Sequence, residues 1–381
     1  MVVRGRHESG NAVLLTGVTG FVGMEVLARY LERSDRRIIT LVRAADDRTA
    51  RARVDAVLNN LFGVRGRRYS KRVDAVAADL LAPSLGLSSA CLQTLARRAS
   101  TIVHSAASVS FTLPLEEARA VNVGGTRQML DLAELALAHG GLDRYAQVST
   151  AYVAGDHCGS FGEHDLDVGQ SFHNSYEQSK FESEQLVRSR AGLPFTILRP
   201  SIVVGDRRSG WTAAFNVLYW PLRAFARGLF TAVPAIPSAP VDVVSIDYVA
   251  DAIHALCEAR DSVGETFHLT AGANATTMEE ISSLASRYFR RPLPKVLSPV
   301  EFAALERDAS PLQRSALEGS RVYFPYFAMG AVFDDAVARA RLDPAGILVS
   351  PLRDYLERLL DFATRTRWGK RPILRGEALS A

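Results

Sequence analysis

The sequence contains few cysteines, no long uncharged hydrophobic run and little excess of one charge. Its three cysteines, Cys91, Cys158 and Cys257, are widely separated and odd in number, which argues against a disulfide framework and against a zinc site. We expect a reducing, cytoplasmic setting and no bound metal. The uncharged runs, such as residues 209–222, are shorter than the roughly 18 residues of a spanning helix. The first ten residues lack the apolar segment of a signal peptide.

The charge balance is mildly basic. A net charge of +4 and a pI near 9.0 are too small for a nucleic-acid-binding footprint, although they favour polyanionic ligands such as nucleotides, coenzyme A or an acidic carrier protein. Hydrophobic residues make up 48% of the chain, enough for an ordinary packed core.

Short β-branched runs alternate with amphipathic helical patterns through the first half of the chain. This alternation predicts a Rossmann-type α/β fold, with a doubly wound parallel sheet covered by helices. Amphipathic stretches that follow strands include 21–31, 121–138 and 175–189. The expected strands are Ala12–Thr16, Ile38–Val42, Val73–Ala77, Thr101–His104, Tyr145–Ser149 and Phe195–Leu198.

The pattern changes near Pro200. Residues 207–243 are rich in aromatics and proline, and helical patterns follow at 246–259, 277–289 and 352–368, with a short strand at 266–269. We therefore expect a nucleotide-binding domain over 11–200 and a smaller, mostly helical substrate-binding region over 201–381. Some of its segments, such as 244–270, are expected to return to the main sheet.

A glycine motif directly follows the first expected strand and opens a helix, which is the context of a dinucleotide-binding turn. Gly17 permits the tight turn, Gly20 lets the backbone approach a pyrophosphate, and Gly23 allows the helix to pack closely on the strand. The free amides of the helix start then face the phosphates. The predicted contacts are Gly17, Thr19, Gly20, Phe21, Val22 and Gly23.

Arg43 follows the second strand, where NAD-binding chains usually carry an acidic residue that accepts from the ribose 2′-OH. A cation there favours a 2′-phosphate, so NADPH is the predicted cofactor; Arg48, Arg51 and Arg53 lie close enough to assist. An exposed surface arginine is the simpler alternative. Further predicted cofactor contacts are Asp79, Leu80, Ser105, Ala106, Ala107 and Asn122.

The fifth strand brings Thr150 to the carboxyl edge of the sheet, where open α/β sheets place their chemistry. Tyr176 and Lys180 lie four residues apart at the start of the next helix and share one face. A neighbouring ammonium favours the phenolate, so Lys180 is expected to lower the pKa of Tyr176 and to hold the nicotinamide ribose. Thr150 is expected to donate to the substrate oxygen. A surface Tyr–Lys pair is the alternative.

Together, the glycine motif, Thr150, Tyr176, Lys180 and the Leu198–Gly205 run resemble an extended short-chain dehydrogenase/reductase over most of residues 11–270. The thioester reductase and fatty acyl-CoA reductase branch is similar in several further details. They are Leu41-Val-Arg43-Ala, His104-Ser-Ala-Ala-Ser-Val, Val148-Ser-Thr-Ala-Tyr-Val153 and Gly205-Asp-Arg-Arg-Ser-Gly-Trp211. The resemblance implies a catalytic set of Thr150, Tyr176 and Lys180. Ala78 departs from the family pattern, which has glycine there.

The resemblance implies NADPH-dependent reduction of an acyl-CoA or acyl-carrier thioester, long-chain by expectation, to an aldehyde or further to an alcohol. The length of 381 residues is the one expected for a stand-alone reductase. The same catalytic set also serves dehydrogenases and epimerases of sterol-like or other alcohols. A nucleotide-sensing protein without catalysis is a third alternative, although a sensor needs none of the three catalytic residues.

The aromatic stretch Trp211–Phe230 has three interpretations: a wall for an acyl chain, plain core packing, or a surface in peripheral contact with a membrane. A basic cluster at residues 65–72 could receive coenzyme A phosphates or an acidic carrier, or could be a solvated face. His157, His164 and His173 precede Tyr176 but match no usual zinc spacing.

Overall fold

The computed structural model describes residues 10–139, 141–307 and 309–380. They fall into two compact units. The first comprises the chain up to Ser149 together with Gln178–Leu198 and Ala250–Phe267, and the second comprises Thr150–Glu177, Arg199–Val249 and the chain from His268 onward. The chain therefore passes between the units several times, twice close to predicted catalytic residues.

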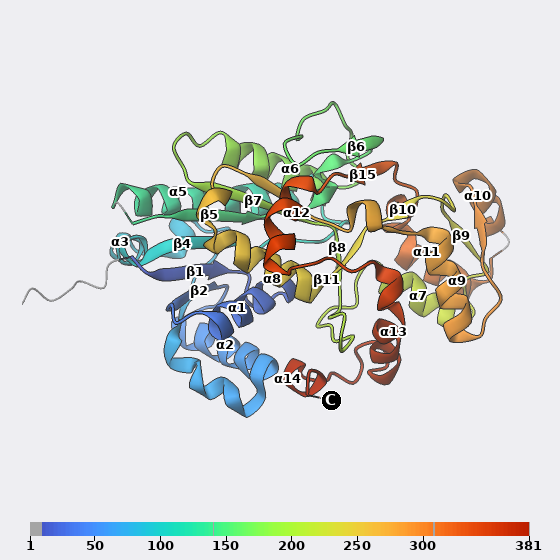
Figure 1. Cartoon of the computed structure of the whole chain (residues 1–381), viewed down its shortest axis with the longest axis horizontal. Helices are drawn as coiled ribbons and strands as arrows, with labels where there is room; N and C mark the ends of the chain where they lie inside the picture. Colours follow the sequence, from blue (N-terminus) through green and yellow to red (C-terminus); the bar gives the residue numbers. More distant parts are fainter. Residues whose placement is uncertain (1–9, 140, 308, 381) are drawn as a thin grey trace, which may run out of the picture. The chain divides into compact units, whose positions relative to one another are not determined.

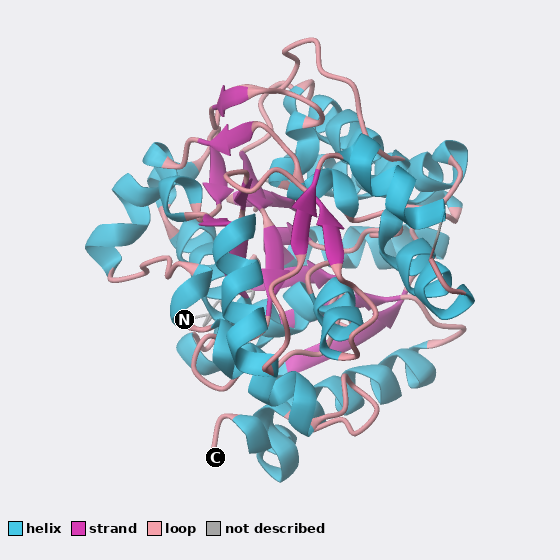
Figure 2. Ribbon diagram, turned by 90° about the vertical axis from the view of Figure 1, so that its right-hand side faces the viewer, coloured by secondary structure: helices cyan, strands magenta, loops and turns pink. Residues whose placement is uncertain are grey.

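The first unit is built on a seven-stranded sheet (Figures 1 and 2). Its strand order is 12-7-5-4-1-2-3, and the five neighbouring pairs from β7 to β3 are parallel. This is the order of a doubly wound nucleotide-binding sheet, with β12 added at the edge, which confirms the predicted fold class. The strands are β1 (Ala12–Thr16), β2 (Ile38–Val42), β3 (Val73–Ala77), β4 (Ala99–His104), β5 (Arg144–Val148), β7 (Phe195–Pro200) and β12 (Thr266–Leu269).

Helices cover both faces of this sheet. Contacts join α1 to α2 and α3 to α5, and α8 packs against α1, where Arg29 bonds Asp251 and the rings of Tyr30 and His254 meet. The helices are α1 (Phe21–Arg33), α2 (Asp47–Phe62), α3 (Ser89–Arg98), α4 (Leu115–Arg119), α5 (Gly125–Ala138), α6 (Ser175–Arg188) and α8 (Ile246–Glu258).

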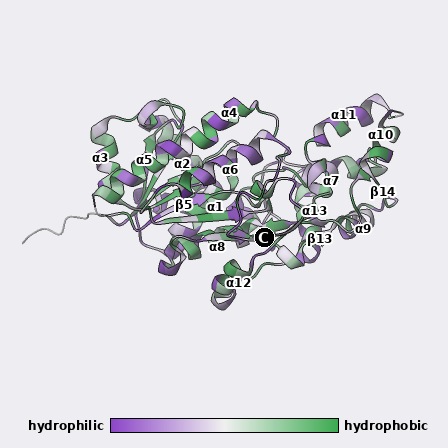
Figure 3. Ribbon diagram, turned by 90° about the horizontal axis from the view of Figure 1, so that it is seen from above, coloured by the Kyte–Doolittle hydropathy of each residue, from purple (hydrophilic) through white to green (hydrophobic). Residues whose placement is uncertain are grey.

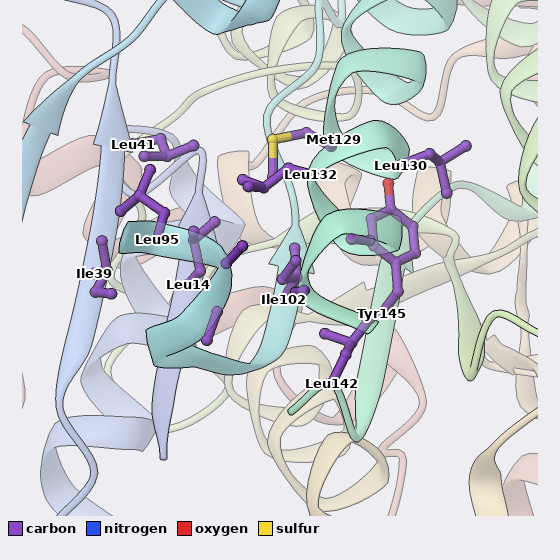
Figure 4. Close-up of a cluster of buried hydrophobic side chains, with 14 of the residues drawn as sticks. Leu14, Ile39, Leu41, Leu95, Ile102, Met129, Leu130, Leu132, Leu142 and Tyr145 are labelled. Atoms are coloured by element: carbon purple, nitrogen blue, oxygen red, sulfur yellow. The ribbon is translucent and has the colours of Figure 1, made fainter. Parts of the chain in front are cut away.

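The core of the first unit lies between the sheet and the α3–α5 layer. Leu14, Ile39 and Ile102 project from the strands toward Leu95 of α3 and Met129 of α5, and all five are almost completely buried (Figure 4). The central strands β1 and β2 are almost entirely hydrophobic, whereas the covering helices carry both hydrophobic and hydrophilic residues (Figure 3). A sheet buried on both faces produces this pattern.

The second unit consists of helices and four short two-stranded ladders. Three ladders are parallel, β8–β11, β9–β14 and β6–β15, and β10–β13 is antiparallel. Its elements are β6 (Gly159–Phe161), β8 (Ile202–Val204), α7 (Tyr219–Ala226), β9 (Ala232–Pro234), β10 (Pro240–Val241), β11 (Val243–Ser245), β13 (Thr276–Thr277), α9 (Met278–Phe289), β14 (Lys295–Leu297), α10 (Pro299–Arg307), α11 (Pro311–Arg321), β15 (Ala331–Phe333), α12 (Ala336–Leu342), α13 (Leu356–Arg365) and α14 (Arg375–Ala378).

None of the described helices combines the length and the hydropathy that crossing a bilayer requires.

Candidate active site

The glycine turn after β1 is a cradle that side chains would fill. Gly17 has φ +78°, and a Cβ there would lie 2.7 Å from the Ala106 amide nitrogen. A Cβ at Gly23 would lie 2.2 Å from the Gly17 carbonyl oxygen. Gly20 precedes α1 and places no side-chain cap over its first turn. Gly17 and Gly23 thus allow backbone to pack directly on backbone at the start of a helix, which is the geometry of a phosphate-binding loop.

Thr16 fixes the backbone opposite this turn, a role that the sequence reading missed. Its Oγ1 accepts from the amides of Ser105 and Ala106, both at 3.1 Å, and lies 2.8 Å from His104 Nδ1. Because both lone pairs of Oγ1 are used, its proton is the one donated to His104. Burial, with a smaller effect from the Lys180 charge, lowers the pKa of His104 to about 3, so the imidazole is neutral.

The other predicted cofactor residues lie at the carboxyl ends of strands or in the helices that follow. Arg43 is exposed after β2, and the Arg53 guanidinium donates to its carbonyl oxygen. Asp79 accepts from the Leu81 amide at 3.0 Å. Leu80 packs where Gly125 leaves room. Thr19 and Gly20 are exposed, and Phe21, Val22, Ser105, Ala106 and Ala107 are half-buried.

Asn122 is buried and holds the segment after β4. Its Oδ1 accepts from the Ser108 amide at 2.8 Å, while its Nδ2 donates to the Ser108 carbonyl at 3.1 Å and to Ser179 Oγ at 2.9 Å. Both N–H donors of this side chain and one of the two lone pairs of its oxygen are therefore directed at protein groups, which fixes the loop after β4.

Thr150 and Tyr176 are joined by a hydrogen bond within the second unit. Thr150 is 3% exposed directly after β5, and its Oγ1 also accepts from the Tyr152 amide at 3.2 Å. Tyr176 is the second residue of α6. Burial raises the pKa of the phenol to about 12, although the bond to Thr150 opposes the rise. The phenol is therefore protonated at neutral pH and can donate.

Lys180 lies one turn further along α6, and its Nζ donates to the Val148 carbonyl oxygen at 2.7 Å. Burial lowers the pKa of its ammonium to about 8, with Glu184 opposing the shift. The expectation that Lys180 lowers the pKa of Tyr176 is therefore wrong in this structure. The desolvation of the buried phenolate raises the pKa of Tyr176 and is the larger effect.

The second unit contains a narrow apolar crevice of about 30 Å³. The aromatic stretch contributes only partly to it. Trp211 is buried elsewhere, where its Nε1 donates to the Ile373 carbonyl, and Trp220 is 44% exposed, so neither lines the crevice. Its lining residues are Leu218, Pro221, Leu222, Phe225, Phe230, Val233, Met278, Ile281, Ser282, Ala285, Pro294 and Phe327.

The histidines before Tyr176 have separate partners. His157 Nε2 lies 3.1 Å from the Ser160 carbonyl, and His173 Nδ1 lies 3.1 Å from Glu177. Within the described ranges, no three histidine, cysteine, aspartate or glutamate side chains are grouped as metal ligands.

Residues 15–253, more than half of the chain, match the family model described as male sterility protein. The chain belongs to this family. It is 31% identical over 277 residues to the nonribosomal peptide synthetase asaC of Aspergillus flavus, covering 69% of this chain and 26% of that protein. It is also 31% identical over 224 residues to a carboxylic acid reductase of Mycobacterium tuberculosis, covering 54% of this chain and 19% of that protein. It thus spans about a fifth to a quarter of these relatives.

Among solved structures, the terminal R domain of the myxalamid PKS-NRPS pathway superposes with a TM-score of 0.81 at 28% identity. The match covers 96% of this chain and 93% of that domain. These relatives confirm the predicted membership in the thioester reductase branch of the extended short-chain dehydrogenase/reductases. As a member of this family, the chain is an NAD(P)-dependent oxidoreductase of the reductase type.

Proposed function

We propose that this protein reduces an acyl thioester with NADPH, giving an aldehyde and, in a second round, the alcohol. The observation that carries the proposal is the hydrogen-bonded pair of Thr150 and Tyr176, with the phenol protonated at neutral pH. Reduction of a carbonyl needs donors at the oxygen where negative charge develops, and two positioned hydroxyls meet this need.

The catalytic roles follow from the states of these groups. A bound NADPH supplies the hydride that adds to the thioester carbon. Thr150 and Tyr176 donate to the carbonyl oxygen, which gains the electron pair of the broken π bond, and Tyr176 can give it a proton. When that oxygen re-forms the carbonyl, it returns its proton to the Tyr176 oxygen, the carbon–sulfur bond breaks and a thiolate leaves, which a thiol pKa near 8.5 permits at neutral pH.

The cofactor is held, in this proposal, by the glycine turn and by the residues after β2, β3 and β4, with Lys180 toward the nicotinamide ribose. Arg43 supports NADPH over NADH, because an exposed guanidinium after β2 suits a 2′-phosphate. The Arg53 guanidinium donates to the Arg43 carbonyl oxygen and therefore lies close to this position, so we propose Arg53 as a second ligand of the 2′-phosphate. Arg51, by contrast, is bound to Asp55 and to the carbonyl of Val73.

The thioester partner is proposed to be an acyl carrier protein or coenzyme A. Relatives described as a nonribosomal peptide synthetase and as a terminal R domain favour the carrier. We assign residues 11–200 to the nucleotide and 201–381 to the substrate. The acyl group is proposed to enter the crevice lined by Phe225 and Phe327, and a long chain requires its side chains to move, because about 30 Å³ holds little more than one water.

The test is NADPH oxidation by the purified protein against a panel of acyl-CoA and acyl-carrier thioesters, with aldehyde and alcohol quantified. Aldehyde formed in proportion to NADPH consumed supports the proposal. Turnover of secondary alcohols or ketones alone would identify a dehydrogenase or epimerase. Tight nucleotide binding without turnover of any substrate would indicate a sensor.

A further inference from the structure

Tyr326 is hydrogen-bonded to the helical turn that carries Tyr176. Its hydroxyl donates to Glu177 Oε1 at 2.6 Å and accepts from Asn174 Nδ2 at 2.8 Å. Tyr326 belongs to the 3-10 helix Phe324–Phe327, about 150 residues away in sequence, and is 3% exposed. A remote part of the second unit is thereby bonded to the residues on both sides of the α6 start.

The same residues cap α6. Asn174 Oδ1 accepts from the Glu177 amide at 3.1 Å, and Glu177 Oε2 accepts from the His173 amide at 2.8 Å. This differs from a reciprocal capping box in one respect, because Glu177 accepts from the amide of His173, the residue before Asn174, and not from the Asn174 amide; the bond from Asn174 still satisfies an amide that has no partner within the helix. The Tyr326 hydroxyl, which comes from outside α6, bonds both of these side chains.

Glu177 is completely buried, so its carboxylate depends on these donors. The phenol of Tyr326 remains protonated, since burial and the Glu177 charge both raise its pKa. Removing its hydroxyl would leave Oε1 without this donor and would free the Asn174 amide. We expect the first turn of α6 to loosen as a result.

Tyr326 also contacts the segment that carries Thr150. Its ring meets the Tyr152 ring edge-to-face, with centroids 4.8 Å apart. The Tyr152 amide donates to Thr150 Oγ1 at 3.2 Å. One side chain therefore touches the turn of Tyr176 and the turn of Thr150.

We propose that Tyr326 is a positioning residue that sets the geometry of the Thr150–Tyr176 pair. The proposal rests on the proposed function and adds to it a residue that does not touch the reacting atoms. Its neighbour Phe327 lines the apolar crevice, so the test must remove the hydroxyl alone and leave the ring in place.

The decisive variant is Tyr326→Phe, and Tyr288→Phe is its matched control. Tyr288 also donates to a carboxylate at 2.6 Å, that of Asp361, on an exposed part of the second unit. Tyr326→Phe should lower kcat about 10- to 100-fold, as misplacement of a reacting group does, with the Kd of NADPH unchanged within about twofold. Tyr288→Phe should leave kcat unchanged. Equal kcat in Tyr326→Phe and the wild type would overturn the proposal.

A double mutant separates positioning from a general loss of structure. If Tyr326 acts through Tyr176, its loss should have no further effect when the phenol is already absent. The variant Tyr176→Phe/Tyr326→Phe should then turn over at the rate of Tyr176→Phe alone. Multiplicative losses would overturn the proposal.

Amide hydrogen exchange tests whether Tyr326 holds the first turn of α6, and it needs no measurement of enzyme activity. The Glu177 amide should exchange at least about tenfold faster in Tyr326→Phe than in Tyr288→Phe or the wild type, because its acceptor Asn174 is released. An unchanged exchange rate of the Glu177 amide would refute the role of Tyr326 in holding this turn. A wild type that reduces no thioester refutes the proposed function instead, and the exchange result still decides the role of Tyr326.

Discussion

At the scale of single residues, the Tyr176 hydroxyl distinguishes a catalytic pair from a structural one. Tyr176→Phe removes only the donor at the reacting oxygen, so NADPH should bind normally while kcat falls at least about 100-fold. Steady-state kinetics and nucleotide titration of this variant and of Tyr288→Phe check the prediction. Turnover near the wild-type value would make the bond between Tyr176 and Thr150 a packing feature.

Arg43 and Arg53 are predicted to select the cofactor. Either change to Ala should cost about 1–3 kcal/mol in NADPH affinity, the usual value of a hydrogen bond to a charged group. NADH serves as the control ligand, since it lacks the 2′-phosphate and its affinity should barely change. Isothermal titration with both nucleotides measures this difference. A wild type that binds NADPH and NADH equally well would contradict the assignment.

Lys180 should make stability depend on pH. Its pKa is about 8 in the fold and near 10.5 when unfolded, so the folded chain binds fewer protons over that range. Its contribution to stability is present above the unfolded pKa and is lost as pH falls through the folded pKa. Relative to Lys180→Met, the wild type should gain about 2 kcal/mol in unfolding free energy from pH 7 to pH 9.5. Urea melts at both pH values measure this, and parallel curves would refute it.

Residue-level reasoning found groups whose neighbours are close in sequence and missed those with remote partners. Thr150, Tyr176 and Lys180 are recognisable because each follows a strand or opens a helix at a fixed spacing. Tyr326 carries no such signal, since its bond to Glu177 depends on how the second unit folds. The pKa of Tyr176 was misjudged for a related reason: spacing reveals the nearby ammonium but not the burial.

At the scale of elements, the β1–α1 turn has little room for a side chain. Gly23→Ala would place a Cβ 2.2 Å from the Gly17 carbonyl oxygen, so the helix must shift away from the strand. We expect a loss of about 1–3 kcal/mol in stability, as overpacking causes, and weaker NADPH binding. Gly124→Ala is the control, because its Cβ would find no atom closer than 3.8 Å. Equal melting temperatures for the two variants would contradict this.

The elements of the first unit were predicted well, because a strand buried on both faces reads as a short apolar run. β1, β2 and β3 have the expected bounds, and α6 ends one residue early, at Arg188. The ladders of the second unit were missed. Strands such as β10, with two residues, are too short to produce a periodic pattern.

At the scale of the whole molecule, the reductase class depends on short local motifs, whereas the proposed acyl specificity depends on segments that are distant in sequence. The glycine turn, the strand ends and the start of α6 carry short motifs that can be recognised in the sequence, so the reductase class could be predicted from it. The crevice is assembled from segments between Leu218 and Phe327 that share no motif. The sequence therefore left three interpretations of the aromatic stretch open, and the structure shows that it is not one wall of the crevice, because Phe225 and Phe230 line the crevice whereas Trp211 and Trp220 do not.

This separation defines the test of acyl specificity. If the acyl chain enters the crevice, each buried methylene should add up to about 0.8 kcal/mol of binding, so kcat/KM should rise from acetyl- toward longer acyl-CoAs until the crevice is full. Phe225→Ala enlarges the crevice and should move the optimum to longer chains. Trp220→Ala is the matched control, because Trp220 is 44% exposed and does not line the crevice.

The measurement is kcat/KM across acetyl- to stearoyl-CoA for the wild type and both variants. The narrow crevice predicts an early plateau in the wild type, unless binding opens it; a steady rise to sixteen carbons would show that it opens. A flat series in all three proteins would remove the crevice from the acyl site. An effect of Trp220→Ala equal to that of Phe225→Ala would mean that the exposed face of α7, and not its buried face, meets the substrate.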